Sequence, residues 1–276
     1  MSVVFWFRHD LRLHDNTGLA AAQQLAQQQG VPLVTCFLAT PGQWAKHEMA
    51  PRQADLLERR LNALGQELAA LGIPLQLLVC DAFGDVPATL SHWLGSQQSA
   101  AGTTPVLYAN RELPLDEVRR DEAVTQALAA CGISCRWFDE RCLFAPGQIQ
   151  TSGGDMFRVF TPFCRAWLRQ LAAQGFSLAS KLQPQGPAIE WQAIQLDYAK
   201  QSSQAWPVSE REVRERLWEF AQHKVVDYAQ RRDLPALAGT SQLSPYLALG
   251  ILSVRQCLAA LQAALGGLRS EEHTSE

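Results

Sequence analysis

Residues 3–16 have the sequence VVFWFRHDLRLHDN, in which five apolar residues are followed directly by a charged segment. The apolar part is rich in β-branched and aromatic residues and has the length of a fully buried strand. Four more short apolar runs follow in the first half of the chain, at residues 33–38, 75–79, 106–108 and 135–138.

The gaps between these runs carry apolar residues at helical spacing, over residues 18–29, 52–71, 86–94 and 115–130. The second gap shows the pattern best, because one face of its helix carries Leu56, Leu57, Leu61, Leu64 and Leu68. Strands that alternate with helices are typical of a parallel sheet covered by helices. The sequence therefore predicts a Rossmann-like α/β domain with a five-stranded parallel sheet and helices on both faces.

The segment after the first strand contains the charged residues Arg8, Asp10, Arg12, His14 and Asp15. It lies at the carboxyl edge of the predicted sheet, where open α/β folds bind ligands. The favoured interpretation is structural, with ion pairs and a cap for the first helix from Asp15 or Asn16. A nicotinamide-dependent dehydrogenase would need a GxGxxG motif here, but the first glycine is Gly18, so this function has weak support.

The composition is that of a globular protein. The chain has 276 residues, of which 47% are hydrophobic and 18% charged, enough for one large domain or two ordinary ones. A formal net charge of −3 argues against non-specific binding of nucleic acid, so a contact with DNA would need a local basic patch. The N-terminus has no basic region before an apolar stretch, and no segment reaches the roughly 18 apolar residues of a membrane helix. We therefore expect a soluble, cytoplasmic monomer that does not bind a membrane.

The seven cysteines are an odd number and lack paired CxxC spacings. Cys131 and Cys135 could form half of a metal site, but no second pair with histidines lies nearby. We therefore expect reduced thiols and no bound metal.

Residues 140–208 are rich in Pro, Gly, Gln and Ser, which is typical of a long connector. One helix is expected within it, at residues 161–174. Ser209 followed by Glu212 has the spacing of a capping box and predicts that a mainly helical region begins there.

Two parts of the chain resemble the DNA photolyase/cryptochrome family. These are residues 5–16 and the segment that reads VDYAQRRDLP at 226–235 and GTSQLSPYLALGILS at 239–253. The resemblance extends from about residue 2 to residue 266. It implies an antenna-binding α/β domain at 1–139, a connector at 140–208 and the start of a helical FAD-binding domain at 209–268. Residues 269–276 resemble nothing in the family, and we expect them to form an unrelated, disordered tail.

The resemblance also assigns residues to the flavin and to DNA. It implies that Tyr228 packs on FAD and that Arg232 contacts DNA phosphates. The FAD diphosphate would be bound by the turn formed by Thr240, Ser241, Gln242, Leu243 and Ser244. Short hydroxyl residues at a helix entry present donors to an anion, although Gln242 stands where the family commonly has Arg or Lys. The structural alternatives are a capped turn before a buried helix, and a solvated Arg232 or an ion pair between Arg232 and Asp233.

Residues 39–53 resemble those bacterial photolyases that carry a folate antenna. The resemblance implies that His47, Asp116 and Glu117 contact 5,10-methenyltetrahydrofolate, since a carboxylate can bind two positions on a pterin edge. Asp116 departs from the family, which has Asn there. The alternative is a surface histidine and the acidic first turn of a helix, where the helix dipole favours carboxylates.

The resemblance implies light-dependent repair of cyclobutane pyrimidine dimers in DNA by electron transfer from reduced FAD. The family's catalytic residues would lie beyond residue 276, so we assign none here and expect this N-terminal piece to be inactive by itself. The partner of the full-length parent would be damaged DNA. Two alternatives remain open: a cryptochrome-type blue-light receptor, and an antenna or nucleotide-binding module without enzymatic activity.

Overall fold

The structure is a computed structural model that describes residues 2–97 and 104–272, with the backbone alone described for 267–272. Its first half is a five-stranded parallel sheet in the order β3-β2-β1-β4-β5. The strands are β1 (Val3–Phe7), β2 (Leu33–Ala39), β3 (Leu75–Val79), β4 (Val106–Asn110) and β5 (Ser134–Phe138). The predicted sheet is confirmed, and β2, β4 and β5 are slightly longer than the apolar runs that indicated them.

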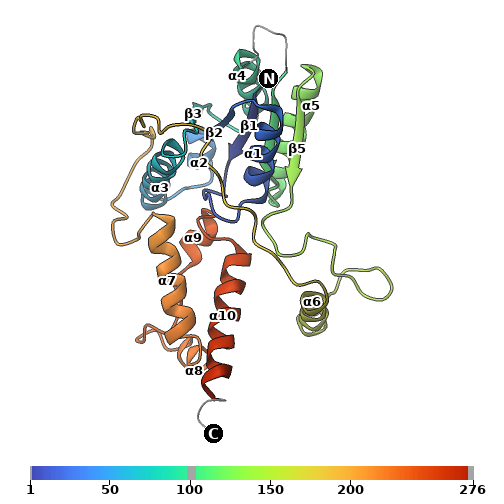
Figure 1. Ribbon diagram of the computed structural model, residues 1–276, viewed down its shortest axis with the longest axis vertical. Helices are drawn as coiled ribbons and strands as arrows, with labels where there is room; N and C mark the ends of the chain where they lie inside the picture. Colours follow the sequence, from blue (N-terminus) through green and yellow to red (C-terminus); the bar gives the residue numbers. More distant parts are fainter. Residues whose placement is uncertain (1, 98–103, 273–276) are drawn as a thin grey trace.

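Helices cover both faces of the sheet, as predicted (Figure 1). Side chains alternate along β1, so Phe5 faces α1 (Thr17–Gln29) and α3 (Pro51–Ala69). Trp6 faces the other way, toward α4 (Val86–Ser96) and α5 (Leu115–Ala130). Two apolar clusters therefore enclose the sheet and hold its strands between them.

The leucine stripe of α3 is buried against the sheet, which confirms the helical face read from the sequence. Leu61, Leu64 and Leu68 are fully buried, and Leu56 and Leu57 are nearly so. The short helix α2 (Pro41–Lys46) was not predicted. It has six residues, begins with a proline and buries only Gln43, so it leaves no apolar periodicity to detect.

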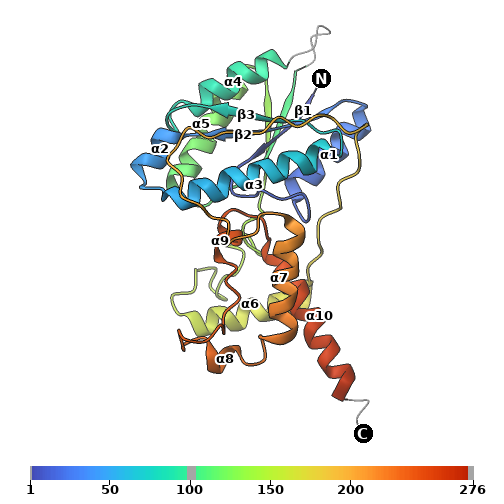
Figure 2. The ribbon, with the colours of Figure 1, turned by 90° about the vertical axis from the view of Figure 1, so that its left-hand side faces the viewer.

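The connector contains α6 (Phe160–Gln174), one residue longer than predicted, and none of its residues is buried. Figure 1 shows α6 standing away from α7 and α10. The following segment, residues 178–208, crosses the α1 and α3 side of the domain (Figure 2). Side chains fasten it there: Gln183 exchanges hydrogen bonds with Gln23, and Ile194 does so with Asn62.

The last part of the chain is helical and has a core of its own. It comprises α7 (Glu210–His223), α8 (Tyr228–Arg231), α9 (Ser244–Ala248) and α10 (Val254–Glu272). Ser209 caps α7 by accepting the Glu212 amide at 3.3 Å, which confirms the predicted N-cap; the Glu212 carboxylate accepts from the Ser209 hydroxyl at 2.5 Å rather than from its backbone amide, as a full capping box would require. Residues 269–272, expected at the start of a disordered tail, continue α10, and 273–276 lie outside the described residues.

None of the helices in the described ranges is long and apolar enough to cross a membrane. All seven cysteines are free thiols.

Candidate functional site

The charged residues that follow β1 are buried. Arg8, Asp10, Arg12 and Asp15 are all less than a tenth exposed. The Asp10 carboxylate accepts the backbone N–H of Arg8 at 2.7 Å and the Asn110 side-chain amide at 2.6 Å. Burial raises the pKa of Asp10, although the positive charges of Arg8 and Arg12 act in the opposite direction.

Asn16 caps α1, which confirms one of the two predicted capping residues. Its side-chain oxygen accepts the Leu19 amide at 3.1 Å and the Asn110 side-chain amide at 2.9 Å. Asn110 ends β4, so this pair of amides joins the ends of β1 and β4. Asp15 is not the cap, because its carboxylate turns toward α10.

A buried network of ion pairs joins the β1 loop to the start of α10. The Arg255 guanidinium donates to both Asp15 carboxylate oxygens, at 3.0 and 3.1 Å, and to Glu140 at 2.5 Å. Glu140 also pairs with Arg12, and the Ser253 hydroxyl donates to Asp15. The ion pairs expected for Arg12 and Asp15 are therefore present, with partners more than 120 residues away in the sequence.

The backbones of the two segments touch at Gly250. The Leu11 amide donates to the Leu249 carbonyl at 3.1 Å, and Arg12 donates to the Gly250 carbonyl at 3.0 Å. Gly250 has a φ of +68°, and a Cβ there would lie 2.1 Å from the His9 carbonyl oxygen. Glycine alone permits this approach.

A second buried carboxylate, Glu210 at the start of α7, binds the same loop from another side. It accepts the backbone amides of Leu13 at 2.5 Å and His14 at 3.1 Å, and it contacts Nδ1 of His14 at 2.7 Å. Arg60 of α3, which is fully buried, donates to Glu210 at 3.1 Å and to the Leu11 carbonyl at 2.9 Å. Three elements are thus joined at one point.

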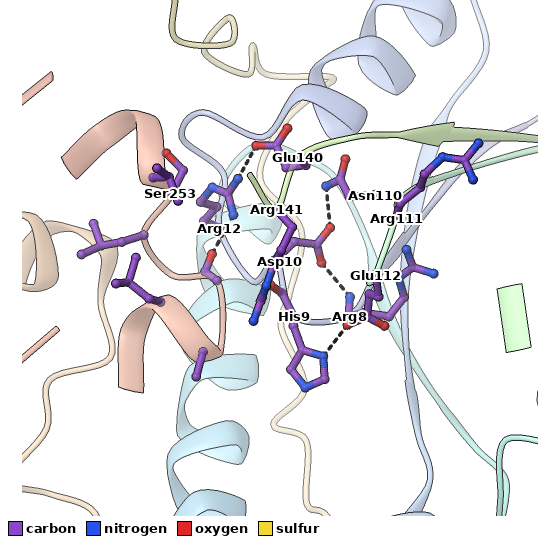
Figure 3. Close-up of a pocket in the computed structure, with 15 residues that line it drawn as sticks. Arg8, His9, Asp10, Arg12, Asn110, Arg111, Glu112, Glu140, Arg141 and Ser253 are labelled. Carbon is purple, nitrogen blue, oxygen red and sulfur yellow. Dashed lines mark hydrogen bonds and ion pairs between the residues drawn. The ribbon is translucent and has the colours of Figure 1, made fainter. Parts of the chain in front are cut away.

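A cavity of about 230 Å³ lies where the strand order reverses, between the ends of β1 and β4. Open α/β sheets bind ligands at this switch point. Its floor and walls come from the β1, β4 and β5 ends, and the α9–α10 turn closes the opposite side (Figure 3). The lining residues are Arg8, His9, Asp10, Arg12, Asn110, Arg111, Glu112, Glu140, Arg141, Leu247, Ala248, Gly250, Leu252, Ser253 and Val254.

Glu112 and Glu140, two of the acidic residues that line the cavity, form ion pairs. Glu112 contacts Nδ1 of His9 and accepts from Arg120 at 2.7 Å. Burial alone would raise the pKa of Glu112, but the His9 hydrogen bond and the positive charges of Arg8 and Arg120 hold it well below its usual range. Two of the three lining carboxylates, Glu112 and Glu140, are thus held by ion pairs, and Asp10 accepts a backbone N–H and an amide, an arrangement that suits the binding of a ligand better than the transfer of protons.

The three residues assigned to folate lie outside this cavity. His47 ends α2, is exposed, and its Nε2 lies 2.8 Å from the Gln43 side-chain amide. Asp116 is exposed in the first turn of α5 and forms a weak ion pair with Arg119 at 3.6 Å. Glu117 beside it is half-buried, and its carboxylate has no hydrogen-bond partner within residues 2–97 and 104–272. His47 and the acidic pair follow β2 and β4 at the same edge of the sheet, with β1 between those strands.

The residues assigned to the flavin diphosphate form the entry to α9. Thr240 and Ser244 are exposed and Ser241 is half-buried, and their hydroxyls make no hydrogen bond to other described residues. Gln242 is exposed and has a φ of +51°, a conformation that a residue with a side chain seldom adopts. The side chain of Leu243 is instead buried in the helical core, so only its backbone can face a ligand.

Tyr228 begins α8, and Arg232 follows its last residue as the C-cap. The Arg232 guanidinium carbon is 5.8 Å from the centre of the Tyr228 ring, which also packs edge-to-face against Phe220 at 5.9 Å. Arg232 pairs with Asp233 at 3.6 Å, as the structural alternative had it, and more than half of its side chain remains exposed. Both residues are therefore accessible from solvent.

The sequence did not reveal the cavity or the residues that close it. Glu112, Glu140 and Arg141 follow β4 and β5, and they reach the cavity because parallel strands end at one edge. The charged run after β1 was the one local signal, and it was interpreted as structural. Nothing near Gly250 or Ser253 indicated that the α9–α10 turn would form the opposite wall.

These features define a class: a doubly wound α/β domain with a binding cavity at its switch point, joined through buried ion pairs to a helical segment. Comparison with known proteins gives the family. Residues 3–185 match the DNA photolyase family model, and the chain belongs to this family.

The relatives extend this assignment. The chain is 42% identical over 265 residues to a deoxyribodipyrimidine photo-lyase of Vibrio cholerae, a match that covers 93% of this chain and 54% of the relative. A bacterial class III photolyase from Agrobacterium tumefaciens has a similar structure, with a TM-score of 0.63, 27% identity, and coverage of 94% of this chain and 52% of the other. A cryptochrome of Synechocystis sp. shares the fold, with a TM-score of 0.70 and 21% identity over 95% of this chain and 55% of the cryptochrome. The chain spans about half the length of the curated relatives it matches.

Proposed function

We propose that the protein containing this chain repairs cyclobutane pyrimidine dimers in DNA by light-driven electron transfer from reduced FAD. The observation that carries the proposal is the 42% identity to a deoxyribodipyrimidine photo-lyase across nearly the whole chain. The Synechocystis cryptochrome supports the shared fold alone, because its identity is 21%. Repair is therefore preferred to a receptor function, which becomes an outcome of the test.

The flavin turn has the properties that a diphosphate needs. The hydroxyls of Thr240, Ser241 and Ser244 lack partners in the described part of the chain, so they remain available as donors. In the proposal these residues and the backbone of Gln242 and Leu243 hold the diphosphate of FAD. When bound, FAD supplies the redox chemistry, and the protein supplies position and electrostatics.

Tyr228 and Arg232 have separate roles in this proposal. Tyr228, 38% exposed, offers a ring against which the flavin packs. Arg232 keeps more than half of its side chain in solvent, where it binds a DNA phosphate. Their mutual contact, 5.8 Å from guanidinium to ring, would orient Arg232 before DNA binds.

The antenna in this proposal is 5,10-methenyltetrahydrofolate, bound by His47, Asp116 and Glu117. Glu117 is the best placed of the three, since its carboxylate is half-buried and free to accept from a pterin edge. Asp116 already faces Arg119, and it adds negative charge beside an anionic ligand. We therefore propose weak folate binding that depends chiefly on Glu117.

The domain boundaries follow from these roles. Residues 1–139 form the antenna-binding α/β domain, 140–208 the connector, and 209–268 part of the helical FAD-binding domain. Damaged DNA would be the partner of the whole protein.

A chimaera tests the function directly. Residues 1–268 are joined to the C-terminal part of the Vibrio cholerae relative, and the product is illuminated with blue light together with ultraviolet-irradiated oligothymidylate. We expect thymine absorbance to recover in light and not in darkness. If the chimaera retained flavin but left the dimers intact, the receptor function would be favoured over repair.

A further inference from the structure

We propose that Arg255 and Glu140 are positioning residues for the flavin turn, so that the α/β domain sets the flavin affinity of the helical segment. The inference rests on the proposed function. It concerns the buried group of Arg12, Asp15, Glu140 and Arg255, called the anchor below.

The anchor is electrically balanced and excluded from water. Two guanidinium groups face two carboxylates, and Asp15 and Glu140 side chains are 1% and 3% exposed. Burying charges in this way costs desolvation, which is offset only when the geometry is good. The anchor therefore favours one relative placement of its two sides over neighbouring ones.

The anchor is connected to the flavin turn by a few residues of fixed conformation. The turn enters α9, which ends at Ala248, and Leu249 and Gly250 follow it directly. Leu249 packs against both the sheet's apolar cluster and the helical core, and its carbonyl accepts the Leu11 amide at 3.1 Å. Leu243 lies within the turn itself and is buried in the helical core. A displacement at the anchor is therefore passed on to the turn.

Apolar packing alone would hold this junction less well. Within the described ranges, Leu249 is the residue that packs against both clusters. The polar contacts of the α9–α10 turn are directional: Arg12 to the Gly250 carbonyl at 3.0 Å, and Ser253 and Arg255 to Asp15, while Glu210 of α7 binds the β1 loop separately. Since a flavin diphosphate needs donors held in a fixed arrangement, loss of the anchor should weaken its binding.

The first test uses the 276-residue chain without any ligand. Hydrogen exchange of the Leu11 amide, which bonds to Leu249, reports whether the junction is closed. We expect Arg255→Gln to accelerate this exchange by about tenfold or more, since a tenfold change corresponds to about 1.4 kcal/mol. Arg255→Lys, which keeps the charge but not the two-pronged fork, should restore part of the protection. The Phe5 amide in β1 shows whether the sheet remains folded.

Arg211→Gln is the matched control, because Arg211 lies on α7 and its pair with Glu215 is exposed and 3.7 Å long. Its exchange at Leu11 should equal that of the unchanged chain. Unaltered protection in Arg255→Gln would overturn the inference. Glu140→Gln provides a second variant of similar shape, and it should also accelerate exchange at Leu11.

The second test measures flavin affinity in the chimaera. Arg255→Gln should raise the Kd for FAD by about tenfold, Arg255→Lys by less, and Arg211→Gln should leave it unchanged. Faster exchange at Leu11 with unchanged flavin affinity would refute the positioning role. The exchange experiment needs no flavin and therefore tests the anchor by itself. A chimaera that binds no flavin would contradict the proposed function and leave the result on the anchor unaffected.

Discussion

Replacing Glu210 by Gln should destabilise the chain strongly at neutral pH. The Glu210 carboxylate is 3% exposed and accepts from the Leu13 amide, the His14 amide and Arg60 at 2.5, 3.1 and 3.1 Å. Glutamine keeps the shape but removes the charge, and one of its terminal atoms becomes a donor that faces another donor. Removing one partner of a buried ion pair costs about 3–5 kcal/mol. Arg60 retains Glu67 at 2.8 Å, so we expect the lower end, about 3 kcal/mol.

The pH dependence follows from the direction of the pKa shift. Burial alone would raise the pKa of Glu210, but the hydrogen bond with His14 and the charge of Arg60 outweigh it and lower the pKa. The folded state therefore favours the carboxylate, which contributes stability above the unfolded pKa of about 4.3. This contribution disappears as the pH falls through the lower, folded-state pKa. The difference between Glu210→Gln and the unchanged chain should be full from pH 5 to 7 and should narrow only below about pH 4.

Urea unfolding followed by circular dichroism measures the difference at each pH. The control is Glu215→Gln on the same helix, whose exposed pair with Arg211 is 3.7 Å long and should contribute at most about 0.5 kcal/mol. The reasoning would be refuted if Glu210→Gln lowered the free energy of unfolding at pH 7 by less than about 1 kcal/mol. It would also be refuted if the difference in unfolding free energy between the variant and the unchanged chain were as large at pH 3 as at pH 7.

Three further predictions concern ligands, the glycine contact and DNA. After gel filtration with an excess of each ligand, the 276-residue chain should retain folate weakly and flavin hardly at all. A yellow protein with one flavin per chain would contradict this, because it would show that the turn binds flavin without any other part of a flavin pocket. Gly250→Ala should lower the free energy of unfolding in urea by about 3 kcal/mol or more, because the new Cβ would meet backbone atoms. The control Gly147→Ala should lower it by about 1 kcal/mol, because Gly147 has a similar φ of +82° but no atom within 4 Å of its Cβ position. Equal decreases for the two variants would contradict this. In the chimaera, Arg232→Ala should weaken binding to damaged and to undamaged DNA by similar factors, and the slope of log affinity against log salt concentration should flatten by about 0.9. An unchanged slope would rule out the phosphate contact. Tyr228→Ala should instead reduce flavin retention.

Local sequence patterns were enough for the five strands, for α1, α3, α4, α5 and α6, and for the N-caps of α1 and α7, but not for the short helix α2. The leucine stripe of α3 is buried as its 3.6-residue period required, and Ser209 and Asn16 cap the helices that follow them. Apolar burial and capping act over a few residues, so they leave a readable trace. The five strands and their order along the chain followed from the same kind of evidence.

The meeting of distant charges left no such trace. Asp15 and Arg255 are 240 residues apart, and Glu210 is 196 residues from His14. A charged residue looks the same in the sequence whether its partner is solvent or a buried guanidinium. The cavity was missed for the same reason, since its wall at Gly250 and Ser253 belongs to a segment assigned to the flavin.

The interior of the α/β domain and its junction with the helical segment are held by different kinds of contact. Inside the α/β domain, apolar side chains such as Phe5 and Leu61 contribute stability that depends little on small shifts. At the junction the contacts are ion pairs and backbone hydrogen bonds, whose strength falls steeply when distances or angles change. Such contacts add less net stability than their number suggests, because desolvation offsets much of it, but they select one orientation. If the turn at the start of α9 binds the flavin as proposed, holding it at a fixed position beside the sheet edge gains more from that selectivity than from a larger apolar contact.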